Sequence, residues 1–168
     1  MIHVCSLARL HDTVTDTGAR HIVTLIKDVS LVRRPECIPE PNHLLLDMDD
    51  ISMPIDGYVL PAEEHVDKLV DFVTGWGRDA PLVVHCYAGI SRSTAGAFVA
   101  ACAISPKRDE TIIARAIREA SPTAVPNRRI VSLADEILGR KGRMVRAVEE
   151  LGPGTTAYEG VPFRLDLA

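Results

Sequence analysis

Short apolar runs recur along the chain and predict four β-strands. They cover residues 2–7, 21–26, 44–48 and 82–84. The last run is short, apolar and β-branched, as expected of a strand that is buried inside a sheet.

Amphipathic patterns between and after these runs predict helices. Residues 61–76 place Val66, Leu69, Val70 and Val73 on one face, with Pro61 suited to the first turn. Residues 109–120 have Asp109 as the expected cap and the expected inner face Ile112, Ile113, Ala116 and Ile117. Residues 95–103 are small and apolar enough for a buried helix, and residues 127–150 predict one long helix or two shorter ones.

Strands that alternate with helices predict an α/β fold: a mainly parallel central sheet of about four to five strands flanked by helices. Ligands of such sheets bind at the carboxyl ends of the strands. With 168 residues, 46% of them hydrophobic, the chain is long enough for one domain with a substantial core. We predict a single domain over residues 1–150 and a C-terminal tail over residues 151–168.

Charge and cysteine usage exclude several classes of protein. The formal net charge of −4 gives no basic surface for nucleic acid. The first residues already follow a strand pattern, and no apolar run approaches the roughly 20 residues that span a bilayer, so we expect a cytoplasmic protein without membrane insertion. The four cysteines and six histidines are scattered, which predicts neither a disulfide framework nor a metal site.

The segment from Val83 to Thr94 changes from a strand pattern to a helix pattern across a tight loop. A loop that ends at a helix N-terminus points several backbone N–H groups at one spot, and the helix dipole adds partial positive charge there. We therefore expect this loop to bind an anion such as phosphate.

Cys86 and Arg92 make this anion site a reactive one. The thiolate is the nucleophilic form of cysteine, and helix N-termini and cationic groups stabilise it, so we expect Cys86 to be largely ionised. Arg92 offers a planar fork of donors to two phosphate oxygens at once. Gly89 suits a turn with positive φ or a close backbone approach. The Ser93 hydroxyl can hydrogen-bond the sulfur and make it a better leaving group.

The motif reads His85-Cys86, five residues, then Arg92-Ser93, with Gly89 inside the loop. At these residues the chain resembles the protein tyrosine phosphatase superfamily, in its compact dual-specificity branch. The resemblance implies that Cys86 is the nucleophile, that Arg92 and Ser93 are catalytic, and that no metal or cofactor is needed. It also implies a phosphate-binding loop, formed by Cys86, Tyr87, Ala88, Gly89, Ile90, Ser91 and Arg92. His85 lies on the other face of the strand and is expected to hold the loop rather than to act as a base.

Other interpretations of the motif explain fewer of its residues. A buried, inert cysteine does not account for an arginine, a glycine and a hydroxyl at fixed offsets. A nucleotide-binding glycine loop is excluded because Gly-Lys-Ser/Thr is absent. Two alternatives stay open: another thiolate enzyme, of the rhodanese or arsenate reductase type, and a non-catalytic phosphate-binding module.

Cleavage of a phosphate monoester also needs a proton for the leaving oxygen, usually from a carboxylic acid on a nearby loop. Acids follow the strand pattern of residues 44–48, and a loop over residues 52–61 comes next. We predict Asp50 as the general acid, because its place just after the strand resembles that of the family's acid. Its separation from Cys86 is longer than usual in the family; Asp56, with a closer spacing, is the main rival, and Asp49 follows.

The expected substrate is a phosphorylated protein, with phosphotyrosine preferred, or a small phosphomonoester. Between Cys86 and Arg92 the loop has no lysine or second arginine, which argues against highly phosphorylated inositol lipids. Tyr58 and Tyr87 are expected near the site. A Pro126-Asn127 pair, also found in many dual-specificity phosphatases, predicts a turn and a helix start.

Overall fold

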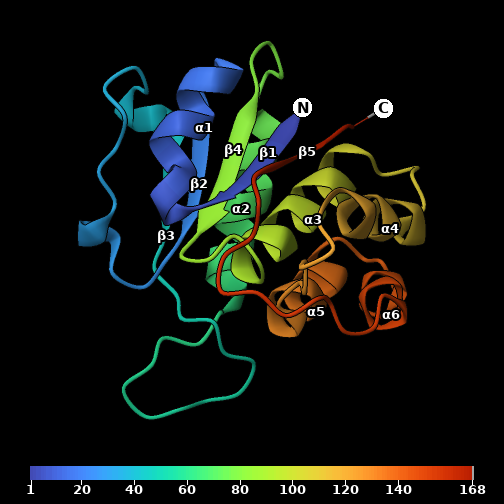
Figure 1. Ribbon diagram of the computed structural model, residues 1–168. Coiled ribbons are helices and arrows are strands. Elements are labelled where there is room, and N and C mark those ends of the chain that lie inside the picture. Colours follow the sequence, from blue (N-terminus) through green and yellow to red (C-terminus); the bar gives the residue numbers. More distant parts are fainter. Residues whose placement is uncertain (168) are drawn as a thin grey trace.

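A five-stranded sheet forms the centre of the computed structural model, which describes residues 1–167 (Figure 1). The strands are β1 (Ile2–Ser6), β2 (His21–Leu25), β3 (His43–Leu46), β4 (Leu82–Cys86) and β5 (Phe163–Leu165). They lie in the order β3-β2-β4-β1-β5; the first four are parallel, and β5 runs antiparallel to β1. The predicted mainly parallel sheet and its four predicted strands are confirmed.

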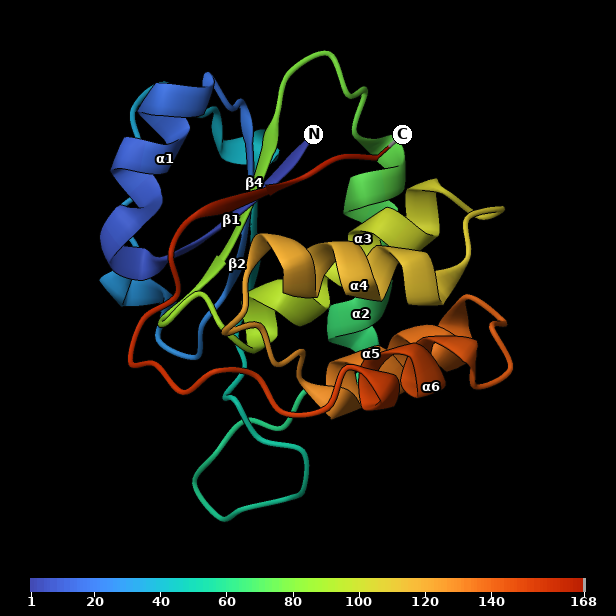
Figure 2. The same ribbon diagram turned by 45° about the vertical axis from the view of Figure 1, so that its right-hand side comes forward.

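Helices cover the two faces of this sheet unequally (Figure 2). On one face lies α1 (Leu10–Thr17). On the other lie α2 (Glu63–Gly75), α3 (Arg92–Ile104), α4 (Glu110–Ala120), α5 (Arg128–Ile137) and α6 (Arg143–Glu150). The connections contain the short 3₁₀ helices η1 (Leu7–Arg9), η2 (Val29–Leu31) and η3 (Glu40–Asn42). No helix within residues 1–167 combines the length and the apolar character needed to cross a membrane.

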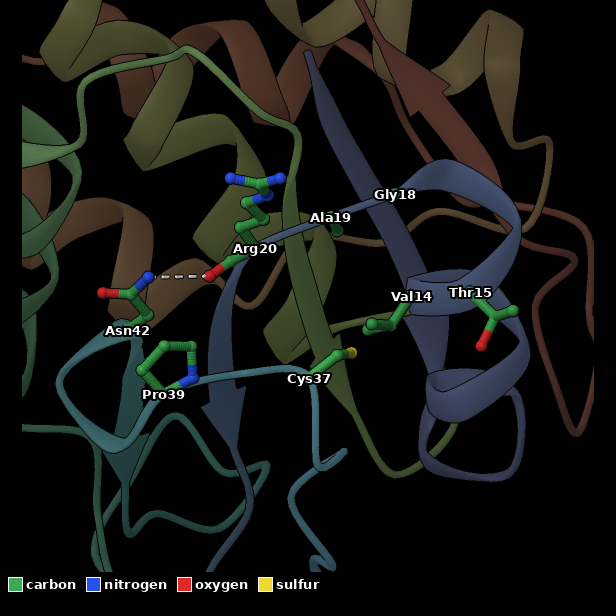
Figure 3. Close-up of a pocket in the computed structure, with 8 residues that line it drawn as sticks. All are labelled: Val14, Thr15, Gly18, Ala19, Arg20, Cys37, Pro39 and Asn42. Carbon is green, nitrogen blue, oxygen red and sulfur yellow. Dashed lines mark hydrogen bonds between the residues drawn. The ribbon is translucent and has the colours of Figure 1, made fainter.

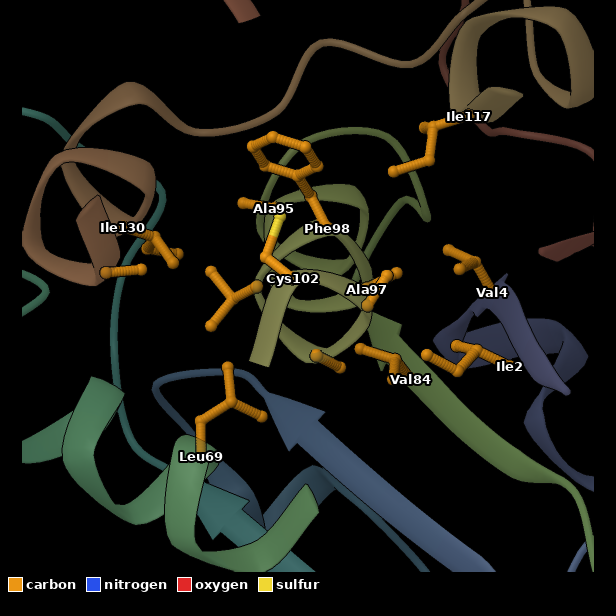
Figure 4. Close-up of a cluster of buried hydrophobic side chains, with 14 of the residues drawn as sticks. Ile2, Val4, Leu69, Val84, Ala95, Ala97, Phe98, Cys102, Ile117 and Ile130 are labelled. Carbon is orange, nitrogen blue, oxygen red and sulfur yellow. The ribbon is translucent and has the colours of Figure 1, made fainter. Parts of the chain in front are cut away.

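The predicted buried helix, α3, lies at the centre of the larger core (Figure 4). Its small residues let it approach the sheet closely: a Cβ on Gly96 would lie 3.1 Å from the Val84 side chain. Ala97 faces the sheet, while Phe98 lies toward the outer helices. Because α3 is packed on all sides, its N-terminus has a fixed place relative to the end of β4.

Two helix predictions need correction in detail. Helix α2 begins at Glu63 after the cap residue Ala62, so Pro61 precedes the helix instead of occupying its first turn. In α4 the Asp109 cap is confirmed, since its carboxylate accepts from two backbone N–H groups of the first turn. Ile112, however, is 56% exposed, because the buried positions follow the spacing i, i+3, i+4, i+7 from Glu110.

The region predicted as one long or two shorter helices forms two, α5 and α6. Gly139 and Gly142 between them have φ of 63° and 81°, a conformation that ends a helix readily. Arg140 in this turn is buried and binds Glu110 of α4 at 2.8 Å, so the turn is fixed to the helix layer. The sequence did not predict α1 or β5, which are short.

Residues 151–168, predicted as a C-terminal tail, run back along the molecule as far as the structure describes them (Figure 1). After passing the end of β4 they form β5, whose Phe163 and Leu165 side chains are buried in the core. This path brings Tyr158–Gly160 against the loop that follows Cys86.

Candidate active site

The candidate site lies at the carboxyl ends of the parallel strands, where β4 ends at Cys86 and α3 begins at Arg92. We call residues 86–92 the phosphate loop. The Cys86 side chain is buried, and its Sγ lies 3.1 Å from the Ser93 hydroxyl. The Gly89 N–H donates to the same sulfur at 3.3 Å. The sulfur of the nucleophile candidate therefore has one hydrogen-bonding partner from its own loop and one from the first turn of α3.

The carbonyl groups of the phosphate loop bind outward, to other parts of the chain. The pairs are Leu7 N–H to Tyr87 O at 3.1 Å, Gly160 N–H to Ala88 O at 2.8 Å, Val125 N–H to Ile90 O at 3.0 Å and Asn127 N–H to Ser91 O at 3.3 Å. In a trans peptide the N–H points away from the C=O. The N–H groups that follow these four carbonyls therefore point toward the inside of the loop, where an anion would meet them.

Gly89 shows why this loop needs glycine. Its φ is 75°, a region that residues with a side chain rarely adopt. A Cβ at this position would lie 2.8 Å from the Ser6 nitrogen and 2.9 Å from the Cys5 carbonyl carbon. Both conditions, positive φ and close backbone approach, apply at this one residue.

The Arg92 guanidinium has one hydrogen-bonded nitrogen and one buried nitrogen without a partner within residues 1–167. Its Nη1 donates to the Met48 carbonyl at 2.8 Å, at the start of the loop that follows β3. Its Nε is buried and has no hydrogen-bond partner within residues 1–167. Buried donors are nearly always paired, so an orphaned guanidinium N–H at the end of the phosphate loop indicates an acceptor that arrives with a ligand. Phosphate oxygens fit that description.

His85 belongs to a buried hydrogen-bonded row beneath the loop. Its Nε2 lies 2.6 Å from the Thr24 hydroxyl, which also lies 2.8 Å from Nε2 of His43. Burial lowers the pKa of His85 to about 3 and that of His43 to about 4, so both are neutral near pH 7. This row connects strands β2, β3 and β4, and no local sequence pattern marks Thr24 or His43 as members.

Asp50 lies at the rim of the phosphate loop. Its Oδ1 accepts from the Ser91 hydroxyl at 2.7 Å and from Nδ2 of Asn127 at 2.8 Å. Asn127 also caps α5, since its Oδ1 accepts from Arg129 N–H and Ile130 N–H. The predicted helix start at Asn127 is confirmed; its second contact, to an acid far away in the sequence, could not be read from the local pattern.

The rival acids lie elsewhere on the same loop. Asp49 accepts from Val59 N–H at 2.7 Å and pairs with Lys27 at 3.4 Å, which closes the base of the loop. Asp56 is exposed, and part of the segment between β3 and α2 projects from the body of the molecule (Figure 1). We call residues 47–62 the acid loop. Of its three predicted candidates, Asp50 is the one bonded to a phosphate-loop residue.

Solved structures provide an independent comparison for this fold; no family model and no curated protein matches the sequence. The chain is 19% identical to DUSP15, with 89% of this chain and 90% of that chain covered and a TM-score of 0.61. It is 18% identical to the PTP-2 phosphatase of Cydia pomonella, with 80% of this chain and 84% of that chain covered and a TM-score of 0.63. It is 17% identical to the human tyrosine phosphatase-like serine/threonine/tyrosine-interacting protein, with 83% of this chain and 92% of that chain covered and a TM-score of 0.64. The chain has the protein tyrosine phosphatase fold.

A pocket of about 670 Å³ in this phosphatase fold lies away from the phosphate loop (Figure 3). It lies between α1 and the segment before β3, where Asn42 donates to the Arg20 carbonyl at 3.0 Å. These residues are at the amino ends of β2 and β3, so the pocket shares no residue with the candidate site. A smaller pocket of about 360 Å³ borders the phosphate loop itself, lined by Leu7, Ala8, Tyr87, Ala88, Tyr158 and Glu159.

The other cysteines of the phosphatase fold lie in different environments from Cys86. Cys5 and Cys102 are buried in apolar surroundings, and burial raises the pKa of each thiol to about 12. Cys37 is exposed in the loop before β3. Within residues 1–167, no three His, Cys, Asp or Glu side chains gather in the way that would hold a metal ion.

Proposed function

We propose that this protein is a cysteine-dependent phosphatase that hydrolyses phosphate monoesters through a cysteinyl-phosphate intermediate. The observation that carries the proposal is the phosphate loop: its carbonyls bind outward, the Gly89 N–H donates to the Cys86 sulfur, and the Nε of Arg92 at the end of the loop has no hydrogen-bond partner within residues 1–167. This arrangement suits the three equatorial oxygens of a phosphoryl group in transfer. The likeness to dual-specificity phosphatases supports the same reading.

In the first step the Cys86 thiolate attacks phosphorus in line with the ester oxygen. A sulfur–phosphorus bond forms while the phosphorus–oxygen bond to the leaving group breaks. The loop N–H groups and Arg92 bind the negative charge on the equatorial oxygens. Asp50, protonated at the start, gives its proton to the departing oxygen, so the alcohol or phenol leaves neutral.

In the second step water replaces the sulfur on phosphorus. Asp50, now ionised, takes a proton from the attacking water, and the sulfur leaves as a thiolate. The Ser93 hydroxyl, 3.1 Å from Sγ, donates to that thiolate as its charge develops. The products are inorganic phosphate and the enzyme in its starting state, without a metal or another cofactor.

Phosphotyrosine on a protein is the substrate class that the surroundings of the loop favour. Tyr87 is 63% exposed beside Cys86, and the acid loop presents exposed apolar side chains at Met53 and Ile55. Such surfaces suit an aromatic ester and its peptide neighbours. One similar structure, PTPMT1, was solved in complex with PI(5)P, at 17% identity and a TM-score of 0.57. Here residues 87–91 carry no cationic side chain to hold further phosphates, so we favour the protein substrate.

Hydrolysis of para-nitrophenyl phosphate by the wild type and two variants tests the proposal. We expect turnover by the wild type and no measurable turnover by Cys86→Ser. For Arg92→Ala we expect a loss of about 10²–10³-fold or more, the usual effect of removing a transition-state donor. A phosphotyrosine peptide and a PI(5)P vesicle, assayed in parallel by phosphate release, separate the two substrate classes.

The same proteins test the two alternatives. Sulfur transfer or thiol-dependent arsenate reduction without phosphatase turnover would support another thiolate enzyme. Binding of a phosphopeptide without turnover would support a non-catalytic module. Either result, with correctly folded wild-type protein, overturns the proposed activity.

A further inference from the structure

The C-terminal segment binds the phosphate loop at the peptide group between Ala88 and Gly89, and this peptide group also binds the Cys86 sulfur. The Gly160 N–H donates to the Ala88 carbonyl at 2.8 Å, on the outside of the loop. The N–H of the same peptide unit, that of Gly89, donates to the Cys86 sulfur at 3.3 Å on the inside. A single rigid plane therefore connects Gly160 to the reacting atom.

Gly160 has no space for a side chain. A Cβ at this position would lie 2.8 Å from the Gly89 carbonyl oxygen and 3.5 Å from Ile90 Cγ1. The nearest atom belongs to the backbone of the phosphate loop, so it cannot move aside without moving the loop. The φ of Gly160 lies outside the left-handed region, so close approach is what requires glycine here.

Two further contacts fix the position of Gly160 relative to the phosphate loop. Before it, Glu159 accepts from the Ser6 hydroxyl at 2.5 Å, and Ser6 is the residue that pairs with Cys86 in the sheet register. After it, β5 pairs with β1, with Phe163 opposite Val4. The segment Tyr158–Gly160 is thus held on both sides at the carboxyl end of β1.

We propose that Gly160 is a positioning residue for the phosphatase reaction and that the segment Tyr158–Gly160 braces the phosphate loop from outside. This inference rests on the proposed function and deepens it. Binding of the Ala88 carbonyl fixes the orientation of the Ala88–Gly89 peptide and polarises its N–H toward the sulfur and the bound phosphoryl group. A displaced loop would still fold, but its N–H groups would no longer meet at one point.

Gly160→Ala tests this directly, with Gly75→Ala as the matched control. Gly75 undergoes the same chemical change at a position where no atom lies within 4 Å of the new Cβ. We expect Gly160→Ala to lower kcat for para-nitrophenyl phosphate by about 10–100-fold, as expected for misplaced reacting groups, and to weaken competitive inhibition by inorganic phosphate. Gly75→Ala keeps wild-type values. Melting temperature and far-ultraviolet circular dichroism, measured alongside, report whether each variant is folded.

A second pair of variants covers the case in which Gly160→Ala does not fold. Glu159→Ala removes the acceptor for Ser6 on an exposed residue, while Glu159→Gln keeps an acceptor oxygen there. We expect a loss of about 3–10-fold in kcat for Glu159→Ala, with most of the activity restored in Glu159→Gln. A purely structural role would lower the melting temperature of Glu159→Ala without changing kcat or the inhibition constant for phosphate.

Binding of inorganic phosphate, measured by calorimetry on the wild type and Gly160→Ala, separates this inference from the proposed function. If the wild type binds phosphate but hydrolyses no ester, the proposed activity is wrong, and weaker binding by Gly160→Ala still supports the brace. If Gly160→Ala is folded and keeps wild-type kcat and phosphate binding, Gly160 has no positioning role. If Gly160→Ala does not fold, wild-type kcat and phosphate binding in a folded Glu159→Ala show that the segment Tyr158–Gly160 does not brace the loop.

Discussion

The phosphate loop and the acid loop serve one site but are held in different ways. In the phosphate loop, four carbonyls accept from backbone N–H groups of three separate segments, at Leu7, at Val125 and Asn127, and at Gly160, and Gly89 has no room for a side chain. The acid loop is held near its start by Arg92 and Asp50, across its base by Asp49, and at Gly57, whose carbonyl accepts from Lys27 at 2.6 Å, while the segment between these contacts projects from the molecule (Figure 2). The phosphate loop must point several peptide groups at one spot, so its backbone is held along its whole length. The acid loop supplies one carboxyl group, so the position of that one residue matters most.

Within the acid loop, we expect substitution of Asp50 and substitution of Asp56 to differ most in their effect on kcat. Asp50→Ala should lower kcat for a phosphotyrosine peptide by about 10²–10⁴-fold, the usual contribution of a general acid. Asp56→Ala, at an exposed residue, should stay near wild type. The loss for Asp50→Ala should shrink with aryl phosphates of more acidic leaving groups, which need less protonation. Equal losses for the two variants across all leaving groups would remove the distinction between them.

Substitution of one glycine in each loop compares the two loops, because Gly89 and Gly57 have nearly the same φ. Gly89 and Gly57 have φ of 75° and 79°, but a Cβ meets backbone at 2.8 Å only in the phosphate loop; at Gly57 no atom lies within 4 Å. We expect Gly89→Ala to lower kcat by about 10²-fold through displacement of the loop. Gly57→Ala should cost about 1–2 kcal/mol of local backbone strain and little activity. Steady-state kinetics and thermal unfolding measure both effects, and similar kinetics for the two would contradict the difference in packing.

Asn127 links the two loops, and its two roles can be separated. Asn127→Ala removes both the α5 cap and the donor to Asp50, whereas Asn127→Ser keeps a capping oxygen but cannot supply that donor. We expect both variants to lose about tenfold in kcat, because Asp50 is less well placed. Asn127→Ala should also lose about 1 kcal/mol of stability, the typical value of a cap. Full activity in Asn127→Ser would show that the amide contact does not position the acid.

The row of His85, Thr24 and His43 beneath the phosphate loop should make the protein less stable in acid, because burial lowers the pKa of both histidines. The folded pKa of His85 is about 3 and that of an unfolded histidine is about 6.5, so the unfolded chain binds more protons between these values. The stability that the neutral imidazole provides is present above about pH 6.5 and falls below it, by up to about 1.4 kcal/mol per pH unit for His85. The partly exposed His43, with a pKa of about 4, adds to the same trend.

Urea unfolding at pH 7 and pH 5 measures this trend. We expect a smaller difference between the two pH values in His85→Gln than in the wild type, whereas His11→Gln, at an exposed histidine, keeps the wild-type difference. An identical pH dependence in all three proteins would show that the row of His85, Thr24 and His43 does not titrate as described.

The sequence predicted the sheet from its short apolar runs, α2 and α4 from their amphipathic period, and α3 from an unbroken stretch of small apolar residues. It missed α1 and β5, which are short and depend on long-range packing for their stability. Within the site it singled out the phosphate loop, whose residues are adjacent in the chain. The Asp50–Asn127 contact, the row of Thr24, His43 and His85, and the Gly160 segment join residues 19 to 153 positions apart in the sequence: 19 for Thr24 and His43, 77 for Asp50 and Asn127, and 153 for Ser6 and Glu159. Pairings of that kind follow from tertiary structure and leave no local period.

Rapid quench of the wild type with a phosphotyrosine peptide, followed by mass spectrometry, tests the central claim most directly. We predict a transient phosphoryl group on the peptide that contains Cys86, formed at the rate of the first step and absent in Cys86→Ser. Turnover with the phosphoryl group on another residue, or with no phosphorylated enzyme at any time, would contradict a mechanism through the Cys86 thiolate.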